Sequence, residues 1–364
     1  MSRFARLCEI ASPTGEEAAV AAAVKAEIES FGIDVFEDDA AGPTGAGSGN
    51  LLFRIEGEKP GYVLFCAHLD TVPHSGPISV VLEDGVYRSG GDTILGADNK
   101  AAVAVMMELT NRYREKRPPI GIEVLFTVAE EQGLLGAVAF DKSLLKARIG
   151  FVFDHATDIG EVITSAPSLH KINAEFKGVE AHAGLVPEAG RSAIAAAATA
   201  ISEMKLGRVD EETTANIGRV EGGSSGNVIP GSCRVSGEAR STDPDRVIEV
   251  IAAMSDSMIS AASEMGCEVD IVTEEVFRGY RIANDSPALA VAEAALRARG
   301  HEPKHVPTGG GSDAHVFILA GIDALLLANG TYDNHTNDES VPQANLVEML
   351  EICEEILIAA AARC

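Results

Sequence analysis

Residues 62–67 read YVLFCA, and His68-Leu69-Asp70 follows them directly. A continuous apolar run of this length predicts a strand that is buried on both faces of a sheet. Similar runs stand at 122–128, 149–153 and 324–328, and helical patterns at 100–113, 134–140 and 345–362 lie between or after them. Strands that alternate with helices predict an α/β sheet.

The segment before this strand combines a helical pattern with a break. Apolar side chains in residues 4–31 have helical spacing, and the stretch SPTGEE at 12–17 interrupts it. Thr14 with Glu17 three residues later has the pattern of a capping box, in which both side chains bind backbone N–H groups at a helix start. We therefore expect a second helix that starts at this box.

The middle of the chain has a different pattern. Strands with one solvated face are expected at 171–176 and 234–240, and a further strand at 267–273. Amphipathic helices are expected at 191–204 and 247–265. This order predicts a ferredoxin-like α+β domain at 165–275. Because buried-strand patterns return afterwards, we expect it to be inserted into a discontinuous first domain, 1–164 and 276–364.

Composition excludes several classes of protein. A length of 364 residues suggests about two domains. The net charge of −26 disfavours binding to nucleic acid or anionic lipid, and no apolar run is long enough for a membrane span. The six cysteines are dispersed and form no C-x-x-C pair, and the start of the chain does not resemble a signal peptide. We therefore expect reduced thiols and a cytoplasmic location.

Residues able to bind a metal follow the predicted strands, where open α/β sheets place their sites. They are His68, Asp98, Glu131, Asp154 and His335, with Asp70 and Glu130 beside them. Each has an ordinary alternative: Asp98 can be a helix N-cap, Glu130 and Glu131 a solvated pair, and Asp158 competes with Asp154. Together, two histidines and three carboxylates suit a pair of zinc ions with one bridging carboxylate.

Seven stretches carry a family resemblance. They are FCAHLDTVP at 65–73, GADNKAAVA at 96–104, TVAEEQGLLGA at 127–137, AHAG at 181–184, GNVIP at 226–230, GGGSDA at 309–314 and the segment around His335. In this order they resemble the signatures of the aminoacylase and carboxypeptidase-G family of zinc metallopeptidases. Within that family, the whole is most similar to peptidase T and its tripeptidase-like relatives.

The resemblance implies a mixed α/β/α sandwich of the zinc-exopeptidase type with an inserted ferredoxin-like lid or dimerisation domain. It implies that Asp98 bridges two metal ions. The other metal ligands that it implies are His68, Glu131, Asp154 and His335. Asp70 would support His68, and Glu130 would be the general base.

Three further roles that the resemblance implies lie in the inserted domain. His182 would stabilise the oxyanion, often across a dimer, and Asn227 and Arg240 would hold the substrate. The periodicity of the helix at 192–204 fits a dimer contact and packing on its own sheet equally well. The resemblance favours a homodimer.

Asp154 also bears on the substrate. Aspartate at this position resembles the aminopeptidase-like members of the family, although His155-Ala156 follows where relatives commonly have a glycine. We expect hydrolysis of the N-terminal peptide bond of short peptides. The alternatives are an N-acyl amino acid amidohydrolase or carboxypeptidase of the same family, or a silent relative, which should have lost Glu130 or a ligand. The expected cofactors are two Zn²⁺ ions, with Co²⁺ or Mn²⁺ equally suited to these ligands.

Overall fold

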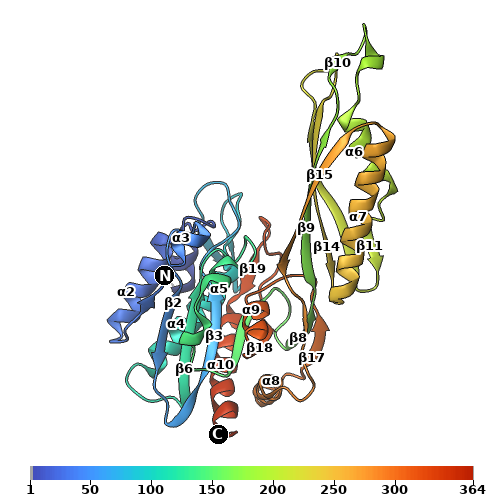
Figure 1. Cartoon of the computed structure of the whole chain (residues 1–364). Coiled ribbons are helices and arrows are strands. Elements are labelled where there is room, and N and C mark those ends of the chain that lie inside the picture. The colour runs from blue at the N-terminus through green and yellow to red at the C-terminus, as the bar shows by residue number, and fades with distance from the viewer. Residues whose placement is uncertain (1–2, 364) are drawn as a thin grey trace. The chain divides into compact units, whose positions relative to one another are not determined.

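The computed structural model describes residues 3–363, and the chain divides into two compact units (Figure 1). The first unit holds the residues up to Thr164 and from Ile282 onward, and the second holds Ser165–Arg281. The boundary expected at 275 falls inside β15 (Glu268–Phe277). That strand pairs with β9 (Ser168–Lys177) along its length, so it belongs to the second unit.

A nine-stranded mixed sheet forms the centre of the first unit. Its order is β1 (Phe36–Glu37), β2 (Leu51–Ile55), β6 (Ile120–Thr127), β3 (Lys59–His68), β7 (Ile149–His155), β18 (Asp323–Ala328), β8 (Glu161–Ala166) and β16 (Tyr280–Arg281), with β17 (Lys304–Pro307) paired to β8. The central strands β6, β3, β7 and β18 are parallel. Their carboxyl ends therefore meet at one edge. A small sheet of β19 (Ser340–Pro342), β5 (Val86–Ser89) and β4 (Val80–Glu83) lies apart from it.

Helices cover both faces of the large sheet. One face shares an apolar core with α1 (Arg3–Cys8), α2 (Ala18–Ser30), α4 (Ala97–Tyr113), α8 (Pro287–Ala298) and α10 (Gln343–Ala361). The buried residues of this core include none from the short helices α3 (Ala41–Thr44), α5 (Leu135–Ala139) and α9 (Ala314–Leu319), and α9 packs on β18. The mixed α/β/α fold expected from the sequence is confirmed.

Alternation along the strands decides which face carries the chemistry. Phe65 and Ala67 of β3 belong to the larger core, so Cys66 and His68 point to the opposite face. Val152 pairs with Cys66, which places Asp154, two residues further on, on the same face as His68. The alternation of side chains and the parallel pairing of β3 with β7 therefore bring His68 and Asp154 together on one face of the sheet.

The second unit is a five-stranded antiparallel sheet with two helices. The sheet order is β11 (Gly207–Asp210), β12 (Thr213–Gly222), β14 (Ser232–Ser241), β9 and β15, and β10 (Ala181–His182) pairs with β13 (Val228–Ile229). The helices α6 (Ala193–Glu203) and α7 (Pro244–Glu264) lie side by side and pack on the sheet (Figure 1). The order β12-β14-β9-β15 is ferredoxin-like, as expected. β11 and β12 were not among the strands expected from the sequence.

The capping box expected at Thr14 and Glu17 is wrong. Helix α2 begins at Ala18, and its N-cap Glu17 makes no capping hydrogen bond. The Thr14 hydroxyl instead donates to Asp70 Oδ2 at 2.7 Å, and Glu17 accepts N–H groups from distant loops. Tertiary partners have replaced the local ones.

Two expectations concern the chain as a whole. None of the helices within residues 3–363 is long and apolar enough to cross a bilayer. In the same range the cysteines are free thiols, namely Cys8, Cys66, Cys233, Cys267 and Cys353.

Candidate active site

His68 ends the central strand β3 and is 2% exposed. Its Nδ1 lies 2.9 Å from the backbone carbonyl of Asp70 and 3.5 Å from that residue's carboxylate. Nδ1–H donates to the carbonyl, so the Nε2 side of the ring faces Asp98 Oδ1 at 3.1 Å and Asp154 Oδ1 at 3.4 Å. The main chain of Asp70, more than its carboxylate, therefore orients the ring.

Asp98 lies between the two histidines. Its second oxygen, Oδ2, is 3.2 Å from His335 Nε2, and Glu131 Oε1 is 3.0 Å from the same nitrogen. Burial alone would raise the pKa of Asp98, but hydrogen bonds from both histidines lower it. The same bonds from Asp98 and Glu131 raise the pKa of His335 to about 10. One carboxylate thus faces two nitrogen donors from opposite sides.

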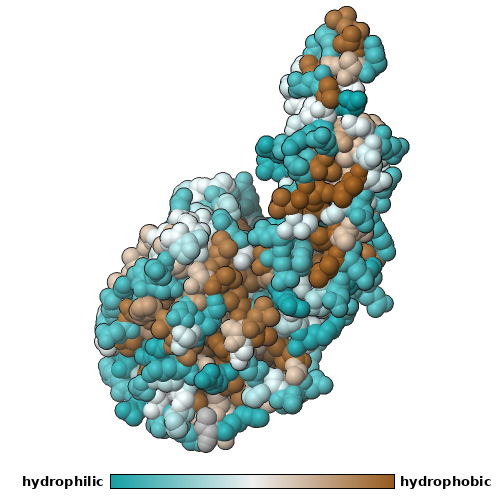
Figure 2. All heavy atoms as spheres, in the orientation of Figure 1, coloured by the Kyte–Doolittle hydropathy of each residue, from teal (hydrophilic) through white to brown (hydrophobic). Residues whose placement is uncertain are grey.

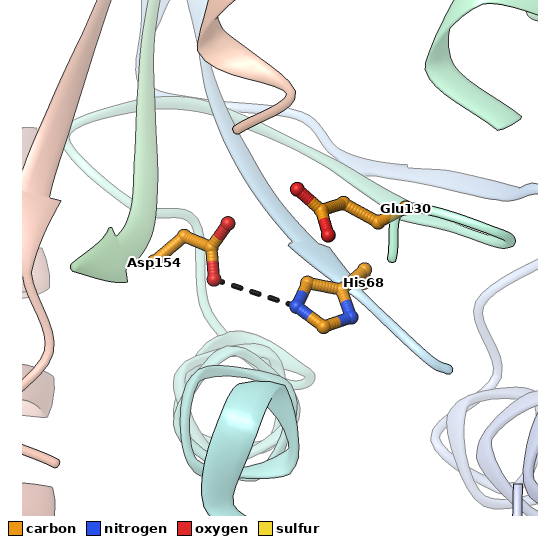
Figure 3. A group of neighbouring side chains, drawn as sticks. All are labelled: His68, Glu130 and Asp154. Atoms are coloured by element: carbon orange, nitrogen blue, oxygen red, sulfur yellow. Dashed lines mark ion pairs between the residues drawn. The ribbon is translucent and has the colours of Figure 1, made fainter. Parts of the chain in front are cut away.

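Glu130 and Asp154 complete the group around His68. Figure 3 shows their carboxylates turned toward the His68 ring, that of Asp154 from β7 and that of Glu130 from the loop after β6. Burial, together with neighbouring carboxylates, raises the pKa of Glu130 well above its usual range and that of Asp154 to about 8. The site holds more carboxylates than its two histidines can neutralise, so a cation is favoured there.

Two overlapping sets of side chains could hold a metal ion. His68, Glu130 and Asp154 form one, and His68, Asp98 and Glu131 form the other, with the ligand atoms of each set within 4.8 Å of one another. Imidazole nitrogen and carboxylate oxygen are ligands that suit zinc and similar divalent cations. The donor set therefore fits a metal centre.

The competing aspartate lies elsewhere. Asp158 accepts a hydrogen bond from the Tyr332 hydroxyl at 2.7 Å, whereas Asp154 accepts one from the Asn99 amide at 2.9 Å. Of the two, the structure brings Asp154 to His68.

The remaining expected residues are in the second unit. His182 is exposed on β10, and the backbone N–H of the adjacent Ala183 donates to the carbonyl of Asn227. Arg240 lies near the carboxyl end of β14 and pairs with Glu238 at 2.8 Å, whereas Asn227 directly precedes β13. His182 and Asn227 are thus neighbours, and Arg240 is separate from them.

Comparison with known proteins identifies the family of this chain. Residues 64–359 match the peptidase family M20/M25/M40. The chain belongs to this family. The family resemblance and the enzyme class expected from the motifs are thereby confirmed.

Three relatives match over nearly their whole length. YqjE of Bacillus subtilis is 38% identical over 363 residues, 99% of this chain and 98% of that protein. The crystal structure of aminopeptidase PepT from Bacillus cereus is 37% identical, with a TM-score of 0.88 and coverage of 98% of this chain and 97% of that one. A tripeptidase structure from Staphylococcus aureus is 35% identical, with a TM-score of 0.93 and coverage of 99% and 97%.

Sequence reasoning on this M20/M25/M40 peptidase missed three residues near the site. Asn99 binds Asp154, as described above. Asp313 is 1% exposed, and its Oδ2 accepts from the Thr127 hydroxyl at 2.5 Å while Oδ1 has no hydrogen-bond partner among residues 3–363. Burial raises the pKa of Asp313 to about 6. Asn99 lies in the motif GADNKAAVA at 96–104, and Asp313 lies in GGGSDA at 309–314. These motifs could therefore have identified both residues as part of the site.

The third missed residue, Glu339, supports the Asp98 loop. It is 1% exposed and accepts the backbone N–H groups of Leu95 at 2.8 Å, Gly96 at 2.7 Å and Asp98 at 2.9 Å. Burial raises the pKa of Glu339 to about 7, against the lowering effect of these N–H groups. No spacing rule singles it out in the polar run at 331–339.

We expect Glu339→Ala to destabilise the first unit. Three backbone N–H groups would lose their acceptor, so the free energy of unfolding should fall by roughly 2–4 kcal/mol in urea denaturation of the metal-free protein. The neighbouring exposed Asp338 provides the control, and Asp338→Ala should change it by no more than about 0.5 kcal/mol. Equal effects of the two substitutions would contradict this account.

Proposed function

We propose that this M20/M25/M40 peptidase is a metal-dependent exopeptidase that hydrolyses the N-terminal peptide bond of short peptides. The proposal depends on the position of the Asp98 carboxylate between the two histidines. Its Oδ1 lies next to His68 Nε2, and its Oδ2 lies next to His335 Nε2. The substrate class is supported by two relatives, an aminopeptidase and a tripeptidase, that match 98% and 99% of the chain.

We assign two divalent metal ions to the site, with zinc as the first candidate and cobalt or manganese as equally suitable ions. His68, Asp98 and Asp154 would hold one ion, and Asp98, Glu131 and His335 the other. When bound, the ions supply Lewis-acid activation of water and of the scissile carbonyl.

Glu130 is assigned the proton transfers. It is 9% exposed, its carboxylate faces His68, and burial raises its pKa well above the usual range of a carboxyl group. As a general base it takes a proton from the attacking water. It then delivers that proton to the leaving amine.

The second unit is assigned substrate binding. His182, with Nδ1 accepting the Gly184 N–H at 3.2 Å, keeps Nε2 available to donate to an oxyanion. Arg240 suits a peptide carboxylate in bidentate fashion, and such a carboxylate would compete with Glu238. Asn227 lies beside His182 and is assigned to the substrate backbone.

We also assign a homodimer and a cytoplasmic location. Apolar side chains gather at the end of the second unit that carries β10 (Figure 2). Four exposed apolar residues before and after β10 in the chain are Val179, Leu185, Val186 and Ile194. Such a cluster favours contact with a second copy of the chain. The free thiols favour a reducing compartment.

The substrate prediction is tested with an unblocked tripeptide beside its N-acetylated form. We expect the reconstituted enzyme to release the N-terminal residue of the free tripeptide, to leave the blocked form intact, and to lose activity with a chelator. Chromatography of the products measures all three. Deacetylation would assign the amidohydrolase alternative, and turnover that survives complete metal removal would contradict the proposal.

The base assignment is tested by Glu130→Gln. The substitution keeps the shape of the side chain but removes its ability to accept a proton, so kcat should fall by about 10²–10⁴-fold. Metal content, measured by atomic emission, should stay at two ions per chain. Undiminished turnover would show that another group accepts the proton.

A pH prediction concerns metal binding. Asp154 raises the pKa of His68 well above its usual range despite the burial of the ring, and hydrogen bonds raise the pKa of His335 to about 10, so the metal-free site favours the protonated form of both rings. Ligating imidazoles must be neutral, so metal binding should release protons and affinity should rise with pH. Calorimetry in buffers of different ionisation enthalpy measures the release. A binding enthalpy independent of the buffer would contradict these protonation states.

A further inference from the structure

We propose that residues 12–17, here called the N-terminal brace, are a positioning part of the active site. In this proposal Thr14 and Glu17 hold Asp70 and the loop 129–131, which carries Glu130 and Glu131. The proposal deepens the proposed function and rests on it, because it concerns the base and one ligand assigned there.

The brace is tied to the chain that follows β3. The Ser12 hydroxyl, fully buried, donates to the Leu69 carbonyl at 2.9 Å. Thr71 N–H donates to the Ser12 carbonyl at 2.9 Å, and Thr14 N–H donates to the Thr71 carbonyl at 3.1 Å. These bonds form a short parallel bridge beside the strand end and set Thr14 next to Asp70.

Thr14 completes the hydrogen bonding of the Asp70 carboxylate. Its hydroxyl donates to Oδ2 at 2.7 Å. Backbone N–H groups of Glu130 and Glu131 donate to Oδ1 and Oδ2 at 3.0 Å and 3.2 Å. One fully buried carboxylate therefore joins the brace to the loop on which both glutamates stand. Hydrogen bonds to an ionised group are among the stronger ones, so Thr14 restricts the orientation of this carboxylate.

Glu17 holds the start of the same loop. Its side chain has no exposed surface, and its Oε1 accepts the N–H groups of Gly15 at 3.1 Å and Ala129 at 3.3 Å, while Oε2 accepts that of Gly47 at 2.6 Å. Ala129 has φ of +51°, a conformation that residues with a side chain adopt only when their surroundings impose it. Glu17 supplies such a constraint directly before Glu130.

The neighbouring backbone is shaped for this contact. A Cβ atom added at Gly47 would lie 2.8 Å from the backbone nitrogen of Glu17, so only glycine allows this approach. Neither Thr14 nor Glu17 caps helix α2 through its side chain, although their spacing in the sequence is that of a capping box. Both polar side chains are therefore committed to the site and not to the helix.

Positioning of this kind has measurable consequences. Groups that orient metal ligands typically change metal affinity or activity by 10–100-fold when removed. Without the brace, the loop 129–131 would lose one restraint at Ala129 and one on Asp70. Glu130 and Glu131 would then be less accurately placed, while the residues assigned to substrate binding stay unchanged.

The test compares two variants with two matched controls in the metal-loaded enzyme. Thr14→Val removes the hydroxyl at nearly constant shape, and Glu17→Gln replaces an acceptor oxygen with an amide that opposes the Gly47 N–H. Thr14→Ser keeps the hydroxyl, and Glu16→Gln changes the exposed neighbouring carboxylate. We expect the first two to lower kcat for a free tripeptide by about 10–100-fold with KM within about twofold, and both controls to stay within about twofold.

Two further readouts do not depend on turnover. Chelator competition should show about 10–100-fold weaker metal binding in Thr14→Val and Glu17→Gln, because Glu131 is on the displaced loop. Hydrogen exchange followed by mass spectrometry should show faster exchange across residues 126–134 in these variants and not in the controls. An inactive wild type with these two responses intact would refute the proposed function and leave the brace standing.

The proposal is overturned by a folded Thr14→Val enzyme with unchanged kcat, metal affinity and exchange. It is also overturned if Glu16→Gln or Thr14→Ser produces the same losses. If Glu17→Gln does not fold, Thr14→Val decides the outcome by itself, since its thermal midpoint, measured alongside, separates loss of position from loss of fold.

Discussion

Repulsion among buried carboxylates is the constraint on which the first unit depends. Asp98, Glu130 and Asp154 lie close around His68, and burial pushes the pKa of the latter two upward. A metal-free chain should spread these groups apart unless something holds the loops that carry them. The structure supplies that restraint through hydrogen bonds from backbone N–H groups.

Three other buried carboxylates provide the restraint. Asp70 accepts the backbone N–H groups of Glu130 and Glu131. Glu339 accepts those of Leu95, Gly96 and Asp98, and Glu17 accepts that of Ala129. Each therefore fixes the backbone of a loop whose side chains face the site. A buried carboxylate is stable when it accepts several hydrogen bonds. Part of the acidity of this chain is thus structural, an explanation that composition alone leaves open.

The sheet explains why widely separated motifs meet. Because β3, β6 and β7 are parallel neighbours, their carboxyl ends share one edge. Because side chains alternate between the two faces of each strand, His68 and Asp154 lie on the same face, away from the larger apolar core. In the sequence, these strands appear as apolar runs that end in polar residues. The fold class, and the meeting of the candidate metal ligands of the first unit at one edge of the sheet, could therefore be predicted from the sequence.

Other features depend on partners that sequence spacing does not reveal. Glu339 acts through amides more than 240 residues away, and the capping-box pattern at Thr14 and Glu17 concealed two long-range contacts. The strand β12 escaped prediction because glycines and charges interrupt its pattern, and the domain boundary was misplaced because β15 is longer than its apolar part. Local rules failed where the partner of a polar group is tertiary.

The two units also differ in how their functional residues are held. In the first unit the candidate base Glu130 and the candidate ligand Asp98 stand on backbone fixed by buried carboxylates. In the second, His182 is exposed and Arg240 is paired with a partly exposed glutamate, a kind of contact worth little in water. In the proposed function, a substrate carboxylate bound to Arg240 would compete with this partly exposed pair. Rigid support suits proton transfer, where small displacements matter, and exchangeable contacts suit the binding of peptides that differ in side chain.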